Sequence, residues 1–227
     1  MIKRNNIILN QKELKTNSLA LIDVKGDGFN KIMGVYELAM KKVEKEIENL
    51  KYILNDYYGY NMINSVSSRI KKPESIINKM KKKNYALNYK ELVENIKDIA
   101  GIRIVSFFKD DLLKIKSMLE VSEEFRVSEE KDYLTKPKKS GYSGYHLIVE
   151  VPVKFEETLF FVNVEIQLRT MAMDFWSTLE HKTKYKTSYK VSRLDSLKLI
   201  CYAKIINKLD EKMAIIYKKQ LEKKTNH

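Results

Sequence analysis

Residues 158–169 are expected to form a β-strand, and the apolar–polar alternation in the second half of this segment limits the fold more than any other feature of the sequence. The second half of the segment places Val162, Val164, Ile166 and Leu168 on one side and Asn163, Glu165, Gln167 and Arg169 on the other. Successive side chains of a β-strand point to opposite faces, so a strand with this pattern buries only one face. We therefore expect a sheet with one covered face and one face lined by polar side chains.

The other periodic segments indicate helices before and after this strand. Apolar residues recur at helical spacing over residues 30–56, and Pro73 followed by Glu74 favours a second helix start. We also expect strands over residues 98–107, 125–134 and 142–153, and helices over residues 110–120, 172–185 and 192–219. This order predicts an α+β chain with a mixed β-sheet flanked by helices, rather than a regular βαβ array.

The length of 227 residues fits one main domain. We assign residues 29–190 to that domain, residues 1–28 to a variable N-terminal segment, and residues 191–227 to a C-terminal helix. The apolar stripe of this helix can face either a partner chain or the core, and it comprises Leu197, Ile200, Ala203, Ile206, Leu209, Met213 and Ile216.

The net charge of +13 points to an anionic partner: nucleotide phosphates, nucleic acid or an anionic membrane surface. Solvated lysine-rich helix faces are the alternative explanation. No apolar run is long enough to span a bilayer, and the N-terminus lacks the apolar core of a signal peptide. Cys201 is the single cysteine and cannot form an internal disulfide, so we expect a cytoplasmic location.

Several common kinds of chemistry find no support in the sequence. It contains no Gly-x-x-x-x-Gly-Lys-Ser/Thr loop, no Gly-x-Gly-x-x-Gly fingerprint and no Gly-x-Ser-x-Gly elbow. Three histidines and one cysteine disfavour a Cys/His zinc site. The candidates that remain are charged residues on or beside the predicted strands.

Two carboxylates are candidate metal ligands. Asp98 begins one predicted strand and Glu165 lies within another. Carboxylates brought together at the ends of strands can hold Mg²⁺, which neutralises charge on a transferring phosphoryl group. A strand-capping role for Asp98 and a solvated sheet face for Glu165 are the alternatives.

Basic side chains near these carboxylates suit a nucleotide. Lys71, Ser75 and Lys79 share one side of the helix predicted after residue 72, and the start of a helix favours phosphate. Arg69 and Arg103 can stack on a base or pair with phosphate, although a salt bridge at the sheet surface also explains Arg103.

Tyr142 and His146 are weaker candidates when taken alone. Tyr142 follows a basic loop over residues 136–141, where its ring is suited to stacking on a base. His146 is expected on the face opposite Tyr145 and Leu147. Ordinary packing in a chain with 14 tyrosines, and a structural role for the histidine, remain open at this point.

Four blocks of sequence, in this order, resemble the synthetase domain of the RelA/SpoT homologue family. They are residues 68–82 (SRIKKPESIINKMKK), 98–104 (DIAGIRI), 138–146 (KKSGYSGYH) and 164–181 (VEIQLRTMAMDFWSTLEH). The resemblance covers about residues 30–190, and it is greatest to the short members called small alarmone synthetases, in particular the RelQ-like group. It implies a nucleotidyltransferase-like fold.

The resemblance implies the activity of a GTP/GDP diphosphokinase of the stringent response. In that reaction the ribose 3′-hydroxyl of GDP or GTP attacks the β-phosphate of ATP with the help of Mg²⁺. AMP leaves, and the product is ppGpp or pppGpp. The RelQ-like group also forms homotetramers through terminal helices, so we expect a homo-oligomer.

The resemblance further implies a role for each candidate residue. Arg69, Lys71, Ser75, Lys79 and Arg103 would bind ATP; Lys138, Tyr142, His146, Gln167, Arg169 and Asp174 would bind the acceptor nucleotide; and Asp98 and Glu165 would be catalytic and hold Mg²⁺. Within these sets the two arginines would sandwich adenine, Tyr142 would stack on guanine, and Asp174 would contact the guanine edge.

The tyrosine loop departs from the family pattern at two positions. Ser143 stands where Arg or Gln is common, and Gly144 where Ser is common. The extra glycine predicts a looser loop, and the choice among GDP, GTP and GMP stays open. We expect no hydrolase activity, because the His-Asp motif of the long family members is absent.

Two other functions fit the positive charge. Toxin-type relatives pyrophosphorylate the 3′ end of tRNA, which the lysine clusters would also suit. A non-catalytic RNA-binding protein would bind RNA in a salt-sensitive way and use no ATP. The second alternative leaves Asp98 and Glu165 without a role, since carboxylates repel phosphate.

Overall fold

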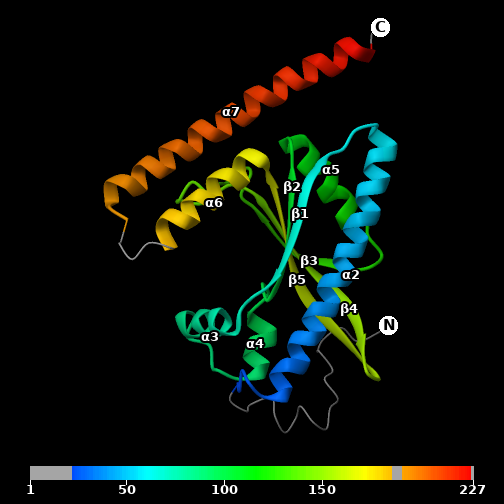
Figure 1. Cartoon of the computed structure of the whole chain (residues 1–227), viewed down its shortest axis with the longest axis vertical. Coiled ribbons are helices and arrows are strands. Elements are labelled where there is room, and N and C mark those ends of the chain that lie inside the picture. Colours follow the sequence, from blue (N-terminus) through cyan, green and yellow to red (C-terminus); the bar gives the residue numbers. More distant parts are fainter. Residues whose placement is uncertain (1–21, 186–190, 226–227) are drawn as a thin grey trace.

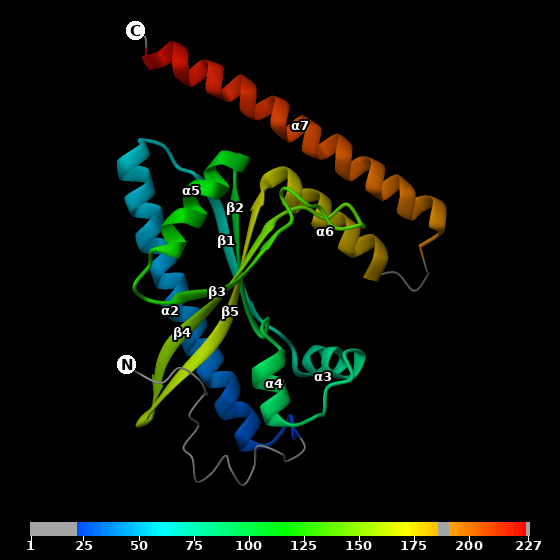
Figure 2. The same cartoon turned by 180° about the vertical axis from the view of Figure 1, so that it is seen from behind.

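The computed structural model describes residues 22–185 and 191–225. Residues 1–21, which form most of the predicted N-terminal segment, lie outside the described part of the chain. Figures 1 and 2 show a twisted sheet with the long helix α2 (Asp27–Tyr58) along one side and α7 (Arg193–Thr225) across one end. Within the described residues, no helix has the length and apolar character that crossing a membrane requires.

The described residues also form four shorter helices: α3 (Pro73–Lys82), α4 (Tyr89–Asn95), α5 (Lys109–Glu120) and α6 (Met171–Tyr185). The strands are β1 (Ile63–Ile70), β2 (Ala100–Ser106), β3 (Arg126–Asp132), β4 (Tyr145–Phe155) and β5 (Thr158–Thr170). Their order in the sheet is β1-β2-β5-β4-β3. Only β2 and β5 run parallel, and the other neighbouring pairs are antiparallel. The predicted mixed sheet flanked by helices is confirmed.

One face of the sheet is the core. It is covered by α2 and α5, which lie on the same side of the strands. The buried strand residues on this face include Ile102, Ile104, Leu147, Val149, Val164, Ile166 and Leu168. The matching buried stripe of α2 includes Val35, Ala39, Val43, Ile47, Leu50 and Leu54. Close packing of these side chains removes apolar surface from water, the main favourable term in folding.

The opposite face carries the polar side chains, and the strand register fixes their neighbours. Arg103 of β2, Gln167 of β5 and His146 of β4 lie side by side across three strands. In the neighbouring row, Gly101 of β2 pairs with both Arg69 of β1 and Glu165 of β5. The alternation predicted for β5 is therefore confirmed, with the even-numbered apolar residues buried.

Two elements were not predicted from the sequence. β1 is an edge strand in which most residues are exposed, so it shows no apolar alternation. α4 has only seven residues, which is too short for a helical stripe to emerge. Asp98 also lies in a turn two residues before β2 rather than at the first position of the strand.

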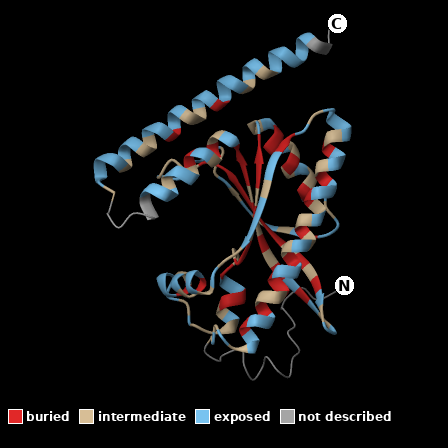
Figure 3. Cartoon of the chain, viewed as in Figure 1, coloured by how far each residue is buried: buried red, intermediate tan, exposed pale blue. Residues whose placement is uncertain are grey.

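The helix α7 packs through a narrow stripe and is exposed along most of its length (Figure 3). Of the apolar stripe expected for it, Ala203 is buried, and Ile200 and Ile206 are partly buried. The other members, Leu197, Leu209, Met213 and Ile216, are all more than half exposed.

Candidate active site on the polar face of the sheet

Asp98 is held between two lysines. Lys71 Nζ donates a hydrogen bond to Asp98 Oδ2 at 2.5 Å, and Lys79 Nζ forms an ion pair with Oδ1 at 2.8 Å. A backbone hydrogen bond from Lys71 N to Ile99 O, 2.8 Å long, fixes the end of β1 beside this turn. Burial opposes ionisation of Asp98, but its bonds to the two lysines outweigh this effect and lower its pKa. The carboxyl is therefore an anion at neutral pH.

Glu165 takes part in a second network. Its Oε1 lies 2.9 Å from His146 Nδ1, and its Oε2 accepts from Gln167 Nε2 at 2.7 Å. Burial again opposes ionisation, yet the bonds from His146 and Gln167 lower the pKa of Glu165 overall. The charge of Asp98 acts on Glu165 in the opposite direction, which shows that the two carboxylates are electrostatic neighbours.

A directed chain of hydrogen bonds links this carboxylate to the tyrosine loop. An ionised carboxylate only accepts, so His146 Nδ1 carries the proton and its Nε2 is free to accept. Tyr142 Oη lies 2.5 Å from that Nε2, and it accepts from Arg169 Nε at 3.2 Å. Arg169, Tyr142 and His146 thus each donate to the next group in the series, which ends at the accepting carboxylate of Glu165.

Two arginines converge on Asp174. Its Oδ1 accepts from Arg169 Nη1 at 3.0 Å and lies 3.1 Å from Arg103 Nη1. Arg169 Nη2 also donates to Gln167 Oε1 at 2.9 Å. The buried Nε of Arg103 has no hydrogen-bond partner among the described residues. Burial and the neighbouring arginines lower the pKa of Arg103, and Asp174 opposes this. The salt bridge that the sequence offered as an alternative for Arg103 therefore exists.

The loop that carries Tyr142 is tightly built. Backbone hydrogen bonds join Gly141 N to Lys138 O at 2.8 Å and Lys138 N to Tyr142 O at 2.9 Å. Two cations make cation–π contacts with the Tyr142 ring: Lys138 Nζ lies 4.7 Å from the ring centre, and Arg169 Cζ lies 5.0 Å from it. The ring is thus surrounded by positive charge.

Gly144 and Ser143, the two positions where the loop departs from the family pattern, both lie in close contact with their surroundings. Gly144 has a φ of +153°, and a Cβ there would approach Leu168 O to 3.2 Å. Ser143 is buried and donates to Tyr133 O at 3.1 Å. Close backbone approach favours glycine at position 144, and Ser143 ties the loop to Tyr133, while the looser loop expected from the extra glycine stays a prediction.

Two predicted site residues stand apart from these networks. Arg69 on β1 and Ser75 on the first turn of α3 are both exposed. Neither side chain forms a hydrogen bond or ion pair within the described residues, although Arg69 pairs through its backbone with Gly101 and its charge reaches Arg103. The structure brings the other eleven predicted residues into the three networks and the tyrosine loop described above.

Sequence reasoning missed Lys131 and Tyr133. Lys131 pairs in register with His146, and its charge interacts with Glu165. The ring of Tyr133 contacts the rings of both Tyr142 and His146, with centroids 5.9 and 5.3 Å away. A strand was predicted here, but its pairing with β4 could not be read from its own residues.

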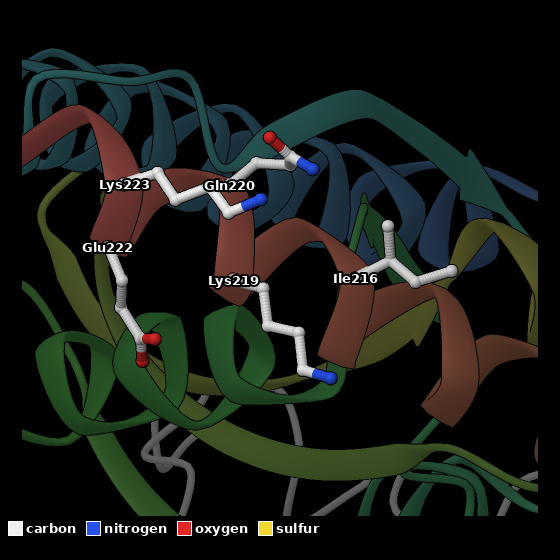
Figure 4. A pocket seen from close by; sticks show the side chains of 5 residues that line it. All are labelled: Ile216, Lys219, Gln220, Glu222 and Lys223. Carbon is white, nitrogen blue, oxygen red and sulfur yellow. The ribbon is translucent and has the colours of Figure 1, made fainter.

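A shallow hollow on α7 is separate from the polar face. Its lining residues all come from the last turns of this one helix (Figure 4): Ile216, Lys219, Gln220, Glu222 and Lys223. None of the predicted site residues takes part in it, so it is not a candidate active site.

The donor set fits a divalent cation only if substrate oxygens complete the coordination. Among the described residues no group of three or more His, Cys, Asp or Glu side chains could hold a metal ion alone. Mg²⁺ in phosphoryl-transfer sites is commonly held by one or two carboxylates together with substrate phosphates. Asp98, in the turn before β2, and Glu165, on the adjacent strand β5, supply two such carboxylates, so they fit this arrangement.

The fold and the site together define a class of protein. A mixed sheet presents carboxylates, lysines and arginines on one face, with an aromatic ring at its edge, and this combination suits phosphorylated, base-containing ligands. Residues 68–190 match the family described as "Region found in RelA / SpoT proteins". The chain belongs to this family.

Named relatives agree with this assignment. The chain is 39% identical over 184 residues to GTP pyrophosphokinase YwaC of Bacillus subtilis, covering 81% of this chain and 88% of the relative. It is 34% identical over 181 residues to GTP pyrophosphokinase YjbM of the same organism, covering 80% and 84%. The crystal structure of small alarmone synthetase 1 from Bacillus subtilis bound to its product pppGpp has a TM-score of 0.79 and 31% identity, covering 86% and 98%.

Proposed function

We propose that this chain is a (p)ppGpp synthetase that transfers pyrophosphate from ATP to the ribose 3′-hydroxyl of GDP or GTP and releases AMP. The observation that carries the proposal is a pair of anionic carboxylates: Asp98, in the turn before β2, is held by two lysines, and Glu165, on the adjacent strand β5, is held by a histidine. Family membership and two relatives named GTP pyrophosphokinase support it.

We assign the ATP side of the site to β1, α3 and β2. Lys71 and Lys79 would exchange part of their contact with Asp98 for the phosphates, which carry more negative charge. The N-terminus of α3 adds Ser75 and a favourable dipole for phosphate. Arg69 is exposed and the side chain of Arg103 is 32% exposed, so both guanidinium planes can stack on adenine.

We assign the acceptor side to β4, β5, the tyrosine loop and α6. Tyr142 would stack on guanine, while Lys138 and the hydrogen-bonded ring of His146 lie beside it to meet the acceptor phosphates. Asp174 can accept from the guanine N1–H and amino group, and its two arginines hold it in place for that contact. Gln167 and Arg169 connect these groups to Glu165.

The reaction forms a bond between the acceptor 3′-oxygen and the β-phosphorus of ATP. The bond between that phosphorus and the oxygen bridging to the α-phosphate breaks, and AMP leaves with the bridging oxygen. Glu165 is held as an anion by His146 and Gln167, and it accepts the proton of the 3′-hydroxyl. Fixed positions for both nucleotides supply much of the rate enhancement in this kind of transfer.

We further propose that Asp98 and Glu165 hold Mg²⁺ with the phosphates of ATP. The ion would neutralise charge on the transferring group and lower the pKa of the acceptor hydroxyl. A lowered pKa of Glu165 makes it a weak base, so this assistance is consistent with the chemistry.

The testing experiment incubates purified protein with ATP labelled in the β- and γ-phosphates, Mg²⁺, and GDP, GTP, GMP or bulk tRNA in separate tubes. We expect a pyrophosphorylated guanine nucleotide with equal release of AMP, measured by anion-exchange chromatography. Glu165→Gln should lower the rate at least about hundredfold, the range for removing an acid–base group. Glu150→Gln is the matched control, since Glu150 lies on β4, the strand next to β5, but pairs with Arg126 at 3.0 Å.

The same tubes test the other functions. Label on tRNA without a labelled nucleotide would refute the proposal in favour of the toxin-type reaction. No product in any tube, with salt-sensitive RNA binding that Glu165→Gln leaves unchanged, would favour an RNA-binding protein.

We also propose that the chain forms a homo-oligomer, specifically a tetramer as in the RelQ-like group. We further propose a cytoplasmic location, where ATP and guanine nucleotides are available. Support for the oligomer comes from the exposed apolar side chains of α7, including Leu197, Leu209 and Met213. A monomeric mass in light scattering at micromolar concentration would contradict the oligomer, and recovery in a membrane fraction would contradict the location.

A further inference from the structure

The helix α7 places one buried carboxylate against the body of the protein. Asp210 is 7% exposed, whereas the other acidic residues of α7, Asp195, Glu211 and Glu222, are exposed. A buried carboxylate is unfavourable unless hydrogen bonds compensate for lost hydration. Asp210 lies in the stripe of α7 that contacts the body of the protein, where the other residues are small or apolar. Its carboxylate therefore needs a specific hydrogen-bond partner.

That partner is Thr170, the last residue of β5. Thr170 Oγ1 donates to Asp210 Oδ2 at 2.8 Å and accepts from Met173 N at 3.2 Å. Thr170 is fully buried and directly precedes α6, so it acts as the N-cap of that helix. Because the hydroxyl has a single proton, donation to Asp210 turns its lone pairs towards the backbone N–H of Met173.

The capped turn lies between two residues of the proposed acceptor site. Arg169 directly precedes Thr170, and Asp174 directly follows Met173. Arg169 Nη1 and Asp174 Oδ1 are 3.0 Å apart, so the ion pair spans the same turn that the cap closes. The ion pair of Asp174 with Arg103 of β2, 3.1 Å long, depends on the same placement of the first turn of α6.

The polar and charged groups that face Asp210 come from three elements. Thr170 faces it from β5, Lys109 from the start of α5, and Glu211 lies beside it on α7. A carboxylate also interacts favourably with the positive N-terminus of α6. Burial is the main influence on Asp210 and raises its pKa, while the bond from Thr170 and the charge of Lys109 oppose this.

We propose that Asp210 is a positioning residue for the acceptor nucleotide, acting through the Thr170 cap to hold Asp174 and Arg169 in register. This inference rests on the proposed function, because it assigns Asp174 to the acceptor guanine. Asp210 bonds to Thr170 and to none of the residues assigned to the substrates. Its loss leaves the lysines around Asp98 in place and loosens the first turn of α6.

The test is steady-state kinetics of the full chain with ATP and GTP varied separately. Asp210→Ala is expected to raise the KM for GTP about tenfold, as for loss of a helix cap, with the KM for ATP within about twofold. Asp210→Asn keeps an acceptor for Thr170 Oγ1 and should recover most of the GTP affinity. Thr170→Val should reproduce the effect of Asp210→Ala, and the double variant should be no worse than either single variant.

Glu211→Ala is the matched control, because Glu211 neighbours Asp210 and ties α7 to Lys109 at 2.7 Å without contacting α6. It should leave both KM values unchanged. Equal rises of both KM values, no recovery in Asp210→Asn, or additive effects of the two single variants would each overturn the inference. If Asp210→Ala fails to fold, Asp210→Glu with Thr170→Ser provides the same comparison.

Failure of the proposed function is separate from failure of this inference. Wild-type protein that makes no pyrophosphorylated guanine nucleotide refutes the proposed function. Active wild-type protein with an unchanged KM for GTP in folded Asp210→Ala refutes only the positioning role.

Discussion

Gly141 occupies a position where a side chain of any size would disturb the tyrosine loop. Its φ is +93°, and a Cβ there would lie 2.7 Å from Ala203 Cβ on α7. Trp176 and Ile200 lie at 3.4 and 3.5 Å, which leaves little room for the loop to retreat. Gly141→Ala should therefore move Tyr142, the next residue, away from its bonds to His146 and Arg169.

Two costs contribute to the effect of Gly141→Ala. The left-handed backbone costs a non-glycine residue about 1–2 kcal/mol. Forcing a methyl group into a filled contact costs about 1–3 kcal/mol more. Together these costs destabilise the present loop conformation by at most about 5 kcal/mol. We expect the KM for the acceptor to rise at least about tenfold.

The contribution of the contact is measured by a double-variant cycle. Ala203→Gly removes the opposing Cβ, at a cost of about 1 kcal/mol for glycine within a helix. Gly141→Ala combined with Ala203→Gly should recover about 1–3 kcal/mol relative to the sum of the single variants. Urea denaturation and the acceptor KM are both measured. Strict additivity in both would refute the argument that Ala203 limits this position.

Two other predictions concern the charged and aromatic networks. Tyr142→Leu should raise the acceptor KM about tenfold or more through lost stacking, whereas Tyr142→Phe keeps the ring. Similar KM values for the Leu variant and wild type would contradict the stacking role. Asp98 has a lowered folded pKa, so its stabilising contribution is present above its unfolded pKa of about 3.9 and is lost as pH falls through the folded value. Asp98→Asn should be less stable than wild type at pH 7 in urea denaturation, and the difference should shrink below about pH 4. A difference that stays constant to low pH would refute the ionic origin.

The sequence alone predicted most of the elements that have a regular pattern. The stripe of α2 and the alternation in β5 are local and repetitive, and tertiary packing only completes what they indicate. The alternation also separated Glu165, Gln167 and Arg169 from the core residues between them. A polar row inside a buried strand could be predicted because neighbouring side chains must point to opposite faces.

The edge strand β1 and the short helix α4 carried no such pattern. β1 has partners on one side only and exposes most of its residues, so burial imposes no alternation on it. For the same reason nothing in the pattern of its own strand singled out Arg69.

The tertiary structure alone decided which residues meet. Glu165 and His146 are 19 residues apart, and the antiparallel register of β4 and β5 brings them to 2.9 Å. Asp98 and Lys71 are 27 residues apart, and their pairing depends on β1 lying beside β2. The inward side of α7, with Asp210 on Thr170, depended on how the helix is rotated against α6. Periodicity reports which side of an element is apolar, but strand order, register and helix rotation depend on packing between residues far apart in the chain.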